Sequence, residues 1–282
     1  MACTDGGSTG GVDPESSWGS VTDAFMQQLQ LYTTRSRRRK DPITPLLAHF
    51  PLWFTAVALT SLLIGLECAA WAAVDVIRRP QPMRVMAVVW PVTMLFAGLL
   101  GLVFYLSHGR SEAKSGGDHD EDASMGVSVA KGTSHCGAGC ALGDLIAEWL
   151  AFAIPVVAVL GGWGWIFEDK MFAVWVIDFV LAFVIGIAFQ YFAIAPMRDQ
   201  SAGRSLLDAV KADAASITAW QVGMFGFMAL IQLVLFPAWC GGRAPVNSPE
   251  FWLAMQWAML AGFATSYPVN WLLVRSGIKE RM

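Results

Sequence analysis

The residues HCGAGC at positions 135–140 bring one histidine and two cysteines together. The C-x3-C spacing puts Cys136 and Cys140 on one face of a helix, whereas a glycine-rich loop would fold both thiols onto one ion. Two thiolates and an imidazole form a soft ligand set that suits Cu(I) or Zn(II). His135, Cys136 and Cys140 are therefore predicted to bind a transition metal ion, with copper preferred to zinc.

Two acids follow the thiols at the same four-residue spacing. Asp144 and Glu148 would share a helix face directly above the cysteines, where they could act as hard ligands or proton acceptors. Asp144 can alternatively be read as the cap of a helix that begins there, because an acid near a helix N-terminus is stabilised by the dipole. The predicted metal set consists of His135, Cys136, Cys140, Asp144 and Glu148.

The dithiol has two further interpretations. Cys136 and Cys140 could cycle between thiol and disulfide, although their spacing differs from the C-x-x-C of the common redox motif. They could also be small residues in a glycine-rich re-entrant turn with no chemical role. The spacing alone does not separate metal binding from disulfide exchange.

Other polar and sulfur-bearing residues lie within apolar runs and are candidates for a pathway. An acid inside a membrane segment indicates function or a structural hydrogen bond to a neighbouring helix. Methionines four apart on a helix could pass Cu(I) between weak sulfur ligands, or could simply fill gaps in the core. The pathway candidates are Glu67, Cys68, Asp178, Met224, Met228, Met255, Met259 and Asn270.

The elements that would position these residues are predicted to be membrane helices. The chain has 282 residues, of which 55% are hydrophobic and only 15% charged, whereas soluble domains carry about a quarter charged residues. With 19 basic and 22 acidic residues, it lacks the concentrated basic face of a nucleic-acid binder. Lipid offers no partner to an open backbone, so long apolar runs must be helical.

The predicted fold is an all-α integral membrane protein with a bundle of about six transmembrane helices. The first 45 residues form a basic, mostly disordered tail, and residues 46–282 form the membrane domain. A loop over 108–141 is expected to hold the Cys/His motif. The six spans are expected near residues 50–77, 84–107, 142–166, 171–196, 216–239 and 250–274.

The distribution of basic residues predicts the orientation of these spans. With six helices, fourteen of the 19 Lys and Arg residues fall on the side that holds both termini. Basic residues concentrate on the cytosolic side of membrane proteins. Both termini and the 108–141 loop are therefore predicted to be cytosolic.

Five blocks of the sequence together carry a resemblance to a known family. They are DVIRRPQPMRVMAVVWPVT (75–93), KGTSHCGAGCALGD (131–144), FQYFAIAPMR (189–198), KADAASITAWQVGMFGFMAL (211–230) and MQWAMLAGFATSYPVNWLLVRSGIKERM (255–282). They resemble the DUF4396 family of polytopic membrane proteins, a domain of unknown function, and the HCGAGC block is the most specific part. The resemblance implies a small multi-helix membrane protein with a Cys/His motif, and it implies no established activity.

Three functions remain open from the sequence. The first is membrane metal handling, with transport or binding of a Cu(I)-like ion through the His-Cys-x3-Cys site at the cytosolic mouth. The second is a non-catalytic scaffold subunit of a homo-oligomer or membrane complex, and the third is an intramembrane thiol oxidoreductase. No catalytic triad, P-loop, GxGxxG or HExxH motif points to soluble-enzyme chemistry.

Overall fold

The computed structural model describes residues 48–110, 124–194 and 202–279. The predicted basic tail lies outside these residues. Within the described part the chain is helical, apart from short turns and one isolated bridge between Trp163 and Phe167. The helices are α2 (Leu52–Arg78), α3 (Met86–Phe104), η1 (Tyr105–Gly109), α4 (Met125–Ala153), α5 (Val156–Leu160), α6 (Lys170–Ile194), α7 (Ala202–Ala229), η3 (Leu230–Leu235), α8 (Phe236–Cys240) and α9 (Pro249–Arg275).

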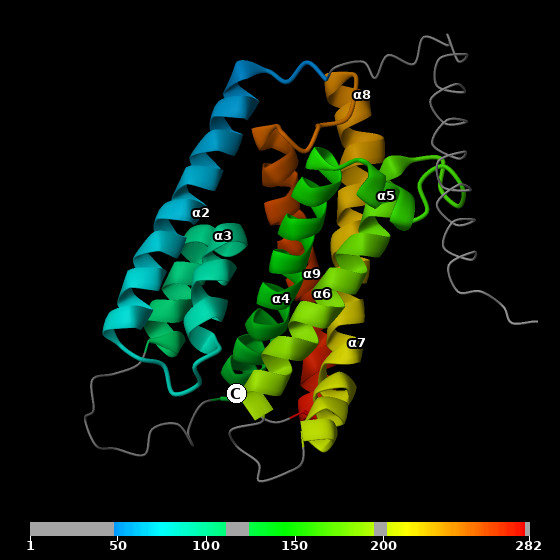
Figure 1. Ribbon diagram of the computed structural model, residues 1–282. Helices are drawn as coiled ribbons and strands as arrows, with labels where there is room; N and C mark the ends of the chain where they lie inside the picture. The colour runs from blue at the N-terminus through cyan, green and yellow to red at the C-terminus, as the bar shows by residue number, and fades with distance from the viewer. Residues whose placement is uncertain (1–47, 111–123, 195–201, 280–282) are drawn as a thin grey trace, which may run out of the picture. The chain divides into compact units, whose positions relative to one another are not determined.

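These helices confirm the predicted all-α membrane bundle. Five helical stretches among the described residues are long and apolar enough to cross a bilayer: Leu52–Arg78, Met86–Gly109, Met125–Ala153, Lys170–Phe192 and Asp213–Cys240. The sixth long helix, α9, has 27 residues but is more polar than these five. It packs against α7, α4 and α2, so it belongs to the same bundle (Figure 1).

The third span and the loop before it were predicted in the wrong place. The helix α4 begins at Met125, where the Ser124 hydroxyl accepts a hydrogen bond from the backbone N–H of Val127, and it ends at Ala153. The motif at 135–140 therefore lies inside a helix and not in a 108–141 loop. Gly, Ser, Thr and His are weak helix formers in isolation, and burial among neighbouring helices overrides that preference.

Small residues on α4 allow a close crossing with α6. A Cβ atom added at Gly143 would lie 2.4 Å from the Ala182 backbone nitrogen, and one added at Gly139 would lie 2.8 Å from Gly186 Cα. Both helices thus carry a small residue every four positions at the contact, which is how membrane helices bring their backbones together. Figure 1 shows α4 and α6 side by side along this crossing.

Polar contacts join α2 and α3 to each other and to the rest of the bundle. At one end, Asp75 accepts hydrogen bonds from Tyr105 and from Arg110, whose Nη2 lies 2.9 Å from Asp75 Oδ1. This pairing raises the pKa of the Arg110 guanidinium above its ordinary value. Further along, α3 breaks at Gly98 (φ 51°), and the Gln256 side chain of α9 donates to the nearby Leu95 carbonyl at 2.8 Å.

Candidate functional site

The central feature of the site is a buried line of reactive side chains on α4. Cys136, Cys140 and Asp144 are 0% exposed and Glu148 is 5% exposed. The four residues follow each other at intervals of four, so they share one face and span about 18 Å along the helix axis. We call this set the α4 stripe. It places two thiols and two carboxyl groups inside the membrane-spanning part of the bundle.

His135 precedes the stripe and is turned toward a different neighbour. Its ring is fully buried and packs edge-on against Phe189 of α6, with 6.0 Å between the ring centroids. Neither ring nitrogen has a hydrogen-bond partner among the described residues. The imidazole lies in electrostatic range of Asp213 and Lys279 at this end of the bundle.

The two thiols of the stripe lie in a sulfur-rich part of the core. Cys136 and Cys140 are both free, and they lie within electrostatic range of each other. One buried cluster contains both of them together with the aromatic ring of Trp220. Both predicted methionine pairs belong to this same cluster, namely Met224, Met228, Met255 and Met259.

The acids of the stripe face polar groups from two other helices. Gln221 of α7 donates from Nε2 to Asp144 Oδ1 at 3.2 Å. Asp178 of α6 is 0% exposed, and neither of its carboxyl oxygens has a hydrogen-bond partner among the described residues. It lies within electrostatic range of both Asp144 and Glu148. Asp144 is in the interior of α4, so its alternative interpretation as the helix cap was wrong.

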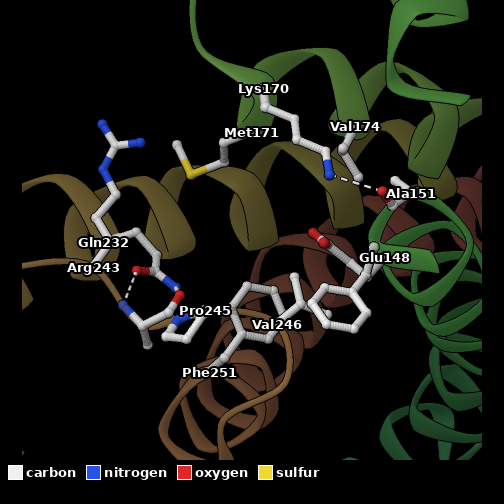
Figure 2. Close-up of a pocket in the computed structure, with 12 residues that line it drawn as sticks. Glu148, Ala151, Lys170, Met171, Val174, Gln232, Arg243, Pro245, Val246 and Phe251 are labelled. Atoms are coloured by element: carbon white, nitrogen blue, oxygen red, sulfur yellow. Dashed lines mark hydrogen bonds between the residues drawn. The ribbon is translucent and has the colours of Figure 1, made fainter. Parts of the chain in front are cut away.

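Glu148 lines a cavity of about 160 Å³ at the far end of the stripe. Figure 2 shows its carboxylate and the Lys170 ammonium on the same side of the cavity, extending from α4 and α6. The Lys170 Nζ donates to the Ala151 carbonyl at 2.7 Å near the end of α4. Beyond α4 and α6, the wall comes from η3, the turn after α8, and α9, and includes Gln232, Arg243, Val246 and Phe251.

The predicted five-residue metal set does not converge on one point. Among the residues that the structure describes, no group of three or more His, Cys, Asp or Glu side chains is arranged so that it could hold a metal ion.

Two predicted pathway residues lie away from the stripe. Glu67 is exposed on the outer surface of α2 and does not enter the interior of the bundle. Cys68 is buried, but in a separate cluster with Trp90 and Tyr105. Asn270 is buried on α9 beside Lys279, at the His135 end.

Three contributors to the site were not among the residues predicted from the sequence. The first is Gln221, whose contact with Asp144 joins positions 77 residues apart. The second is the buried pair of Asp213 and Lys279, which lie outside the expected spans 216–239 and 250–274. The G-x-x-x-G spacing of Gly139 and Gly143 was a readable signal for close helix packing inside a membrane.

An all-α bundle of apolar helices, with carboxyl groups buried among them, defines this chain as an integral membrane protein. It belongs to the family described as Domain of unknown function (DUF4396), whose model matches residues 127–279. The matched segment contains the α4 stripe, Asp178, Gln221 and Lys279, whereas the similar block at 75–93 lies before it. No curated protein and no solved structure matches the sequence.

Proposed function

We propose that this protein is a membrane transporter that moves a small cation along the α4 stripe, and that Cu(I) is its cargo. The observation that carries the proposal is a carboxyl group, Asp178, held at 0% exposure with both oxygens unpartnered, in range of Asp144 and Glu148. Uncompensated acids inside a membrane protein are costly and mark ion pathways. A bundle that only needed stability would place apolar residues here.

The sulfur groups support the choice of cargo. Cys136 and Cys140 belong to the same buried cluster as Met224 and Met228, so a soft ion leaving the thiols would find thioethers in the same core. Thiolate and thioether ligands select Cu(I) over hard cations. The carboxyl groups further along the stripe would then attract the cation toward the cavity at Glu148.

The helical setting of the thiols argues against the oxidoreductase alternative. Side chains at i and i+4 of a helix have Cβ atoms about 5–6 Å apart, whereas a disulfide needs about 3.5–4.5 Å. Oxidation of Cys136 and Cys140 would therefore require α4 to unwind where it is packed against α6 and α7. A redox cycle would have to break this packing at every turnover.

The described chain begins and ends at opposite ends of the bundle. The His49 N–H donates to the Cys240 carbonyl near the Glu148 cavity, whereas Lys279 lies in range of His135, so the prediction that both termini share one side was wrong. In this proposal the His135 end of the stripe faces the cytosol and the Glu148 cavity faces the opposite side. Cu(I) would then meet the thiols near the cytosol and the acids near the cavity. This direction of the stripe is part of the proposal.

The test is Cu(I) flux into proteoliposomes that contain a membrane-impermeant Cu(I) chelator, with the external ion kept reduced. The wild type should accumulate the coloured chelate, and Cys136→Ser/Cys140→Ser should lower the initial rate by at least about tenfold. Cys68→Ser/Cys240→Ser is the matched control, because neither of those cysteines belongs to the sulfur-rich cluster.

Two outcomes would overturn the proposal at different levels. Equal loss of flux in both double variants would remove the thiol pair from the pathway. Absence of Cu(I) flux in the wild type, together with absence of proton flux reported by an internal pH dye, would remove transport itself and favour the scaffold interpretation.

A further inference from the structure

A buried lysine lies at the His135 end of the bundle. Lys279 follows α9 and is 3% exposed, and its ammonium donates to Asp213 of α7 and, at 2.8 Å, to Asn270 Oδ1 of α9. Asp213 is 0% exposed, and its second oxygen, Oδ2, has no partner among the described residues. A charged pair at this depth is unusual, because each ion loses its hydration when it is buried.

The turn after α9 is built to return the chain into the bundle. Gly277 has φ of 72°, a conformation that suits glycine, and its N–H donates to the Val274 carbonyl at 3.2 Å. The N–H groups of Ile278 and Lys279 both donate to the Leu273 carbonyl. This arrangement is a helix C-terminal motif that reverses the chain direction. It turns the Lys279 side chain inward.

The groups around the ammonium have the chemistry of a cation site. The oxygens come from a carboxylate, Asp213, and an amide, Asn270, and hydrogen bonding from Ser216 at 2.9 Å fixes the orientation of the amide. Carboxylate and amide oxygens are hard ligands. One carboxylate supplies one negative charge, which a monovalent cation neutralises.

We infer that Lys279 is a tethered ammonium that occupies a site for a hard monovalent cation, formed by Asp213 and Asn270, and that it holds this end of the α4 stripe closed. The claim that Lys279 occupies the site depends only on the contacts of its ammonium group. The closing role rests on the proposed transport function, because it requires the stripe that begins beside His135 to be a pathway.

The first experiment tests occupancy without any transport. Full-length wild type and Lys279→Met are purified in detergent, and their melting temperatures are compared in sodium, potassium or choline chloride at about 0.1 M, so that screening is constant. Loss of the ammonium leaves Asp213 unpaired, so the variant in choline should melt about 10 °C below the wild type. Sodium or potassium should recover part of that loss, and the wild type should not respond.

The double variant Asp213→Asn/Lys279→Met is the matched control. It removes both charges, so it should melt above Lys279→Met in choline and should be indifferent to the cation. If Lys279→Met is destabilised equally in all three salts, the pair is a structural tie and the inference of a cation site is wrong. A Lys279→Met that is as stable as the wild type in choline would also overturn it.

If Lys279→Met does not fold, a labelling experiment tests whether the Lys279 ammonium is held in the site. Amine acetylation of the wild type followed by mass spectrometry should modify Lys211, which is exposed, and spare Lys279. Gly277→Ala strains the turn without changing any charge, and should make Lys279 reactive. Equal reactivity of the two lysines in the wild type would show that the site is not occupied.

The closing role is then tested by flux. Gly277→Ala should raise the Cu(I) flux of the proteoliposomes above that of the wild type if release of Lys279 opens the stripe. A response of stability to sodium or potassium without any change in flux would keep the cation site and reject the closing role. If the wild type shows no Cu(I) flux, the proposed function is wrong. The cation site is still tested, because the melting temperatures are measured independently of transport.

Discussion

The close crossing of α4 and α6 makes Gly143→Ala the most informative single change in the protein. The added methyl group would lie 2.4 Å from the Ala182 backbone nitrogen and 2.6 Å from its Cα. Backbone atoms cannot move aside as a flexible side chain would. One of the two helices must therefore shift by roughly 1 Å, because ordinary carbon contacts need about 3.5 Å or more.

The magnitude follows from two opposing effects. Overpacking of a tight contact costs about 1–3 kcal/mol, and the clash with backbone points to the upper end of that range. Replacing a helical glycine with alanine gains about 1 kcal/mol through propensity. The net loss should be about 2 kcal/mol, which lowers the folding equilibrium constant by a factor of about 30.

Gly226→Ala is the matched control for this change. Gly226 is also helical and lies on an exposed face of α7, and an added Cβ atom there meets nothing within 4 Å. It should show only the propensity gain. Both variants are unfolded in mixed detergent and SDS and followed by tryptophan fluorescence, which the 13 Trp residues make strong. If Gly143→Ala is as stable as Gly226→Ala, the glycines are not needed for the crossing.

Three further predictions address the buried charges. Asp178→Asn should abolish Cu(I) flux and yet raise stability in detergent by about 1 kcal/mol, since an unpartnered carboxyl is removed from the interior; a loss of stability would show that Asp178 has a structural role. Tyr105→Phe removes the 2.9 Å hydrogen bond to Asp75 and should cost about 1.5–3 kcal/mol in the same unfolding assay, because the acceptor is charged. Glu67→Leu should leave flux unchanged, because that side chain is on the outer surface of α2, and reduced flux in proteoliposomes would place it back in the pathway.

The apolar runs of the sequence predicted most of the spans. The prediction was wrong where a helix is rich in small residues and has few large apolar ones. The segment from Lys131 to Asp144 contains four glycines and two cysteines, and it reads as a loop when hydropathy alone is considered. Its burial comes from close approach of α6 and α7, which no local property of the segment records. The third span was therefore predicted to begin at 142, although α4 begins at Met125.

The spacing predicted that Asp144 and Glu148 lie on a helix face directly above the cysteines, but it did not predict that all four residues belong to one continuous helix. Starting the helix at 142 separated Cys140 from Asp144 by a supposed boundary between loop and membrane. Contacts such as that of Gln221 with Asp144 depend on which helices become neighbours, and spacing along one helix does not predict them. The outward position of Glu67 was missed because an apolar run without periodicity does not reveal which face is buried.

The glycines and the acids of α4 are structurally linked. Gly139 and Gly143 precede Cys140 and Asp144 by one position each, which turns the two stripes about 100° apart on the helix. The crossing that pairs Gly143 with Ala182 also brings Asp178, one turn before Ala182 on the antiparallel helix α6, into range of Asp144 and Glu148. A wider crossing would move that carboxyl away from the stripe. The glycine face therefore sets the distances between the buried acids, and a role for HCGAGC in packing is a condition for a role in transport.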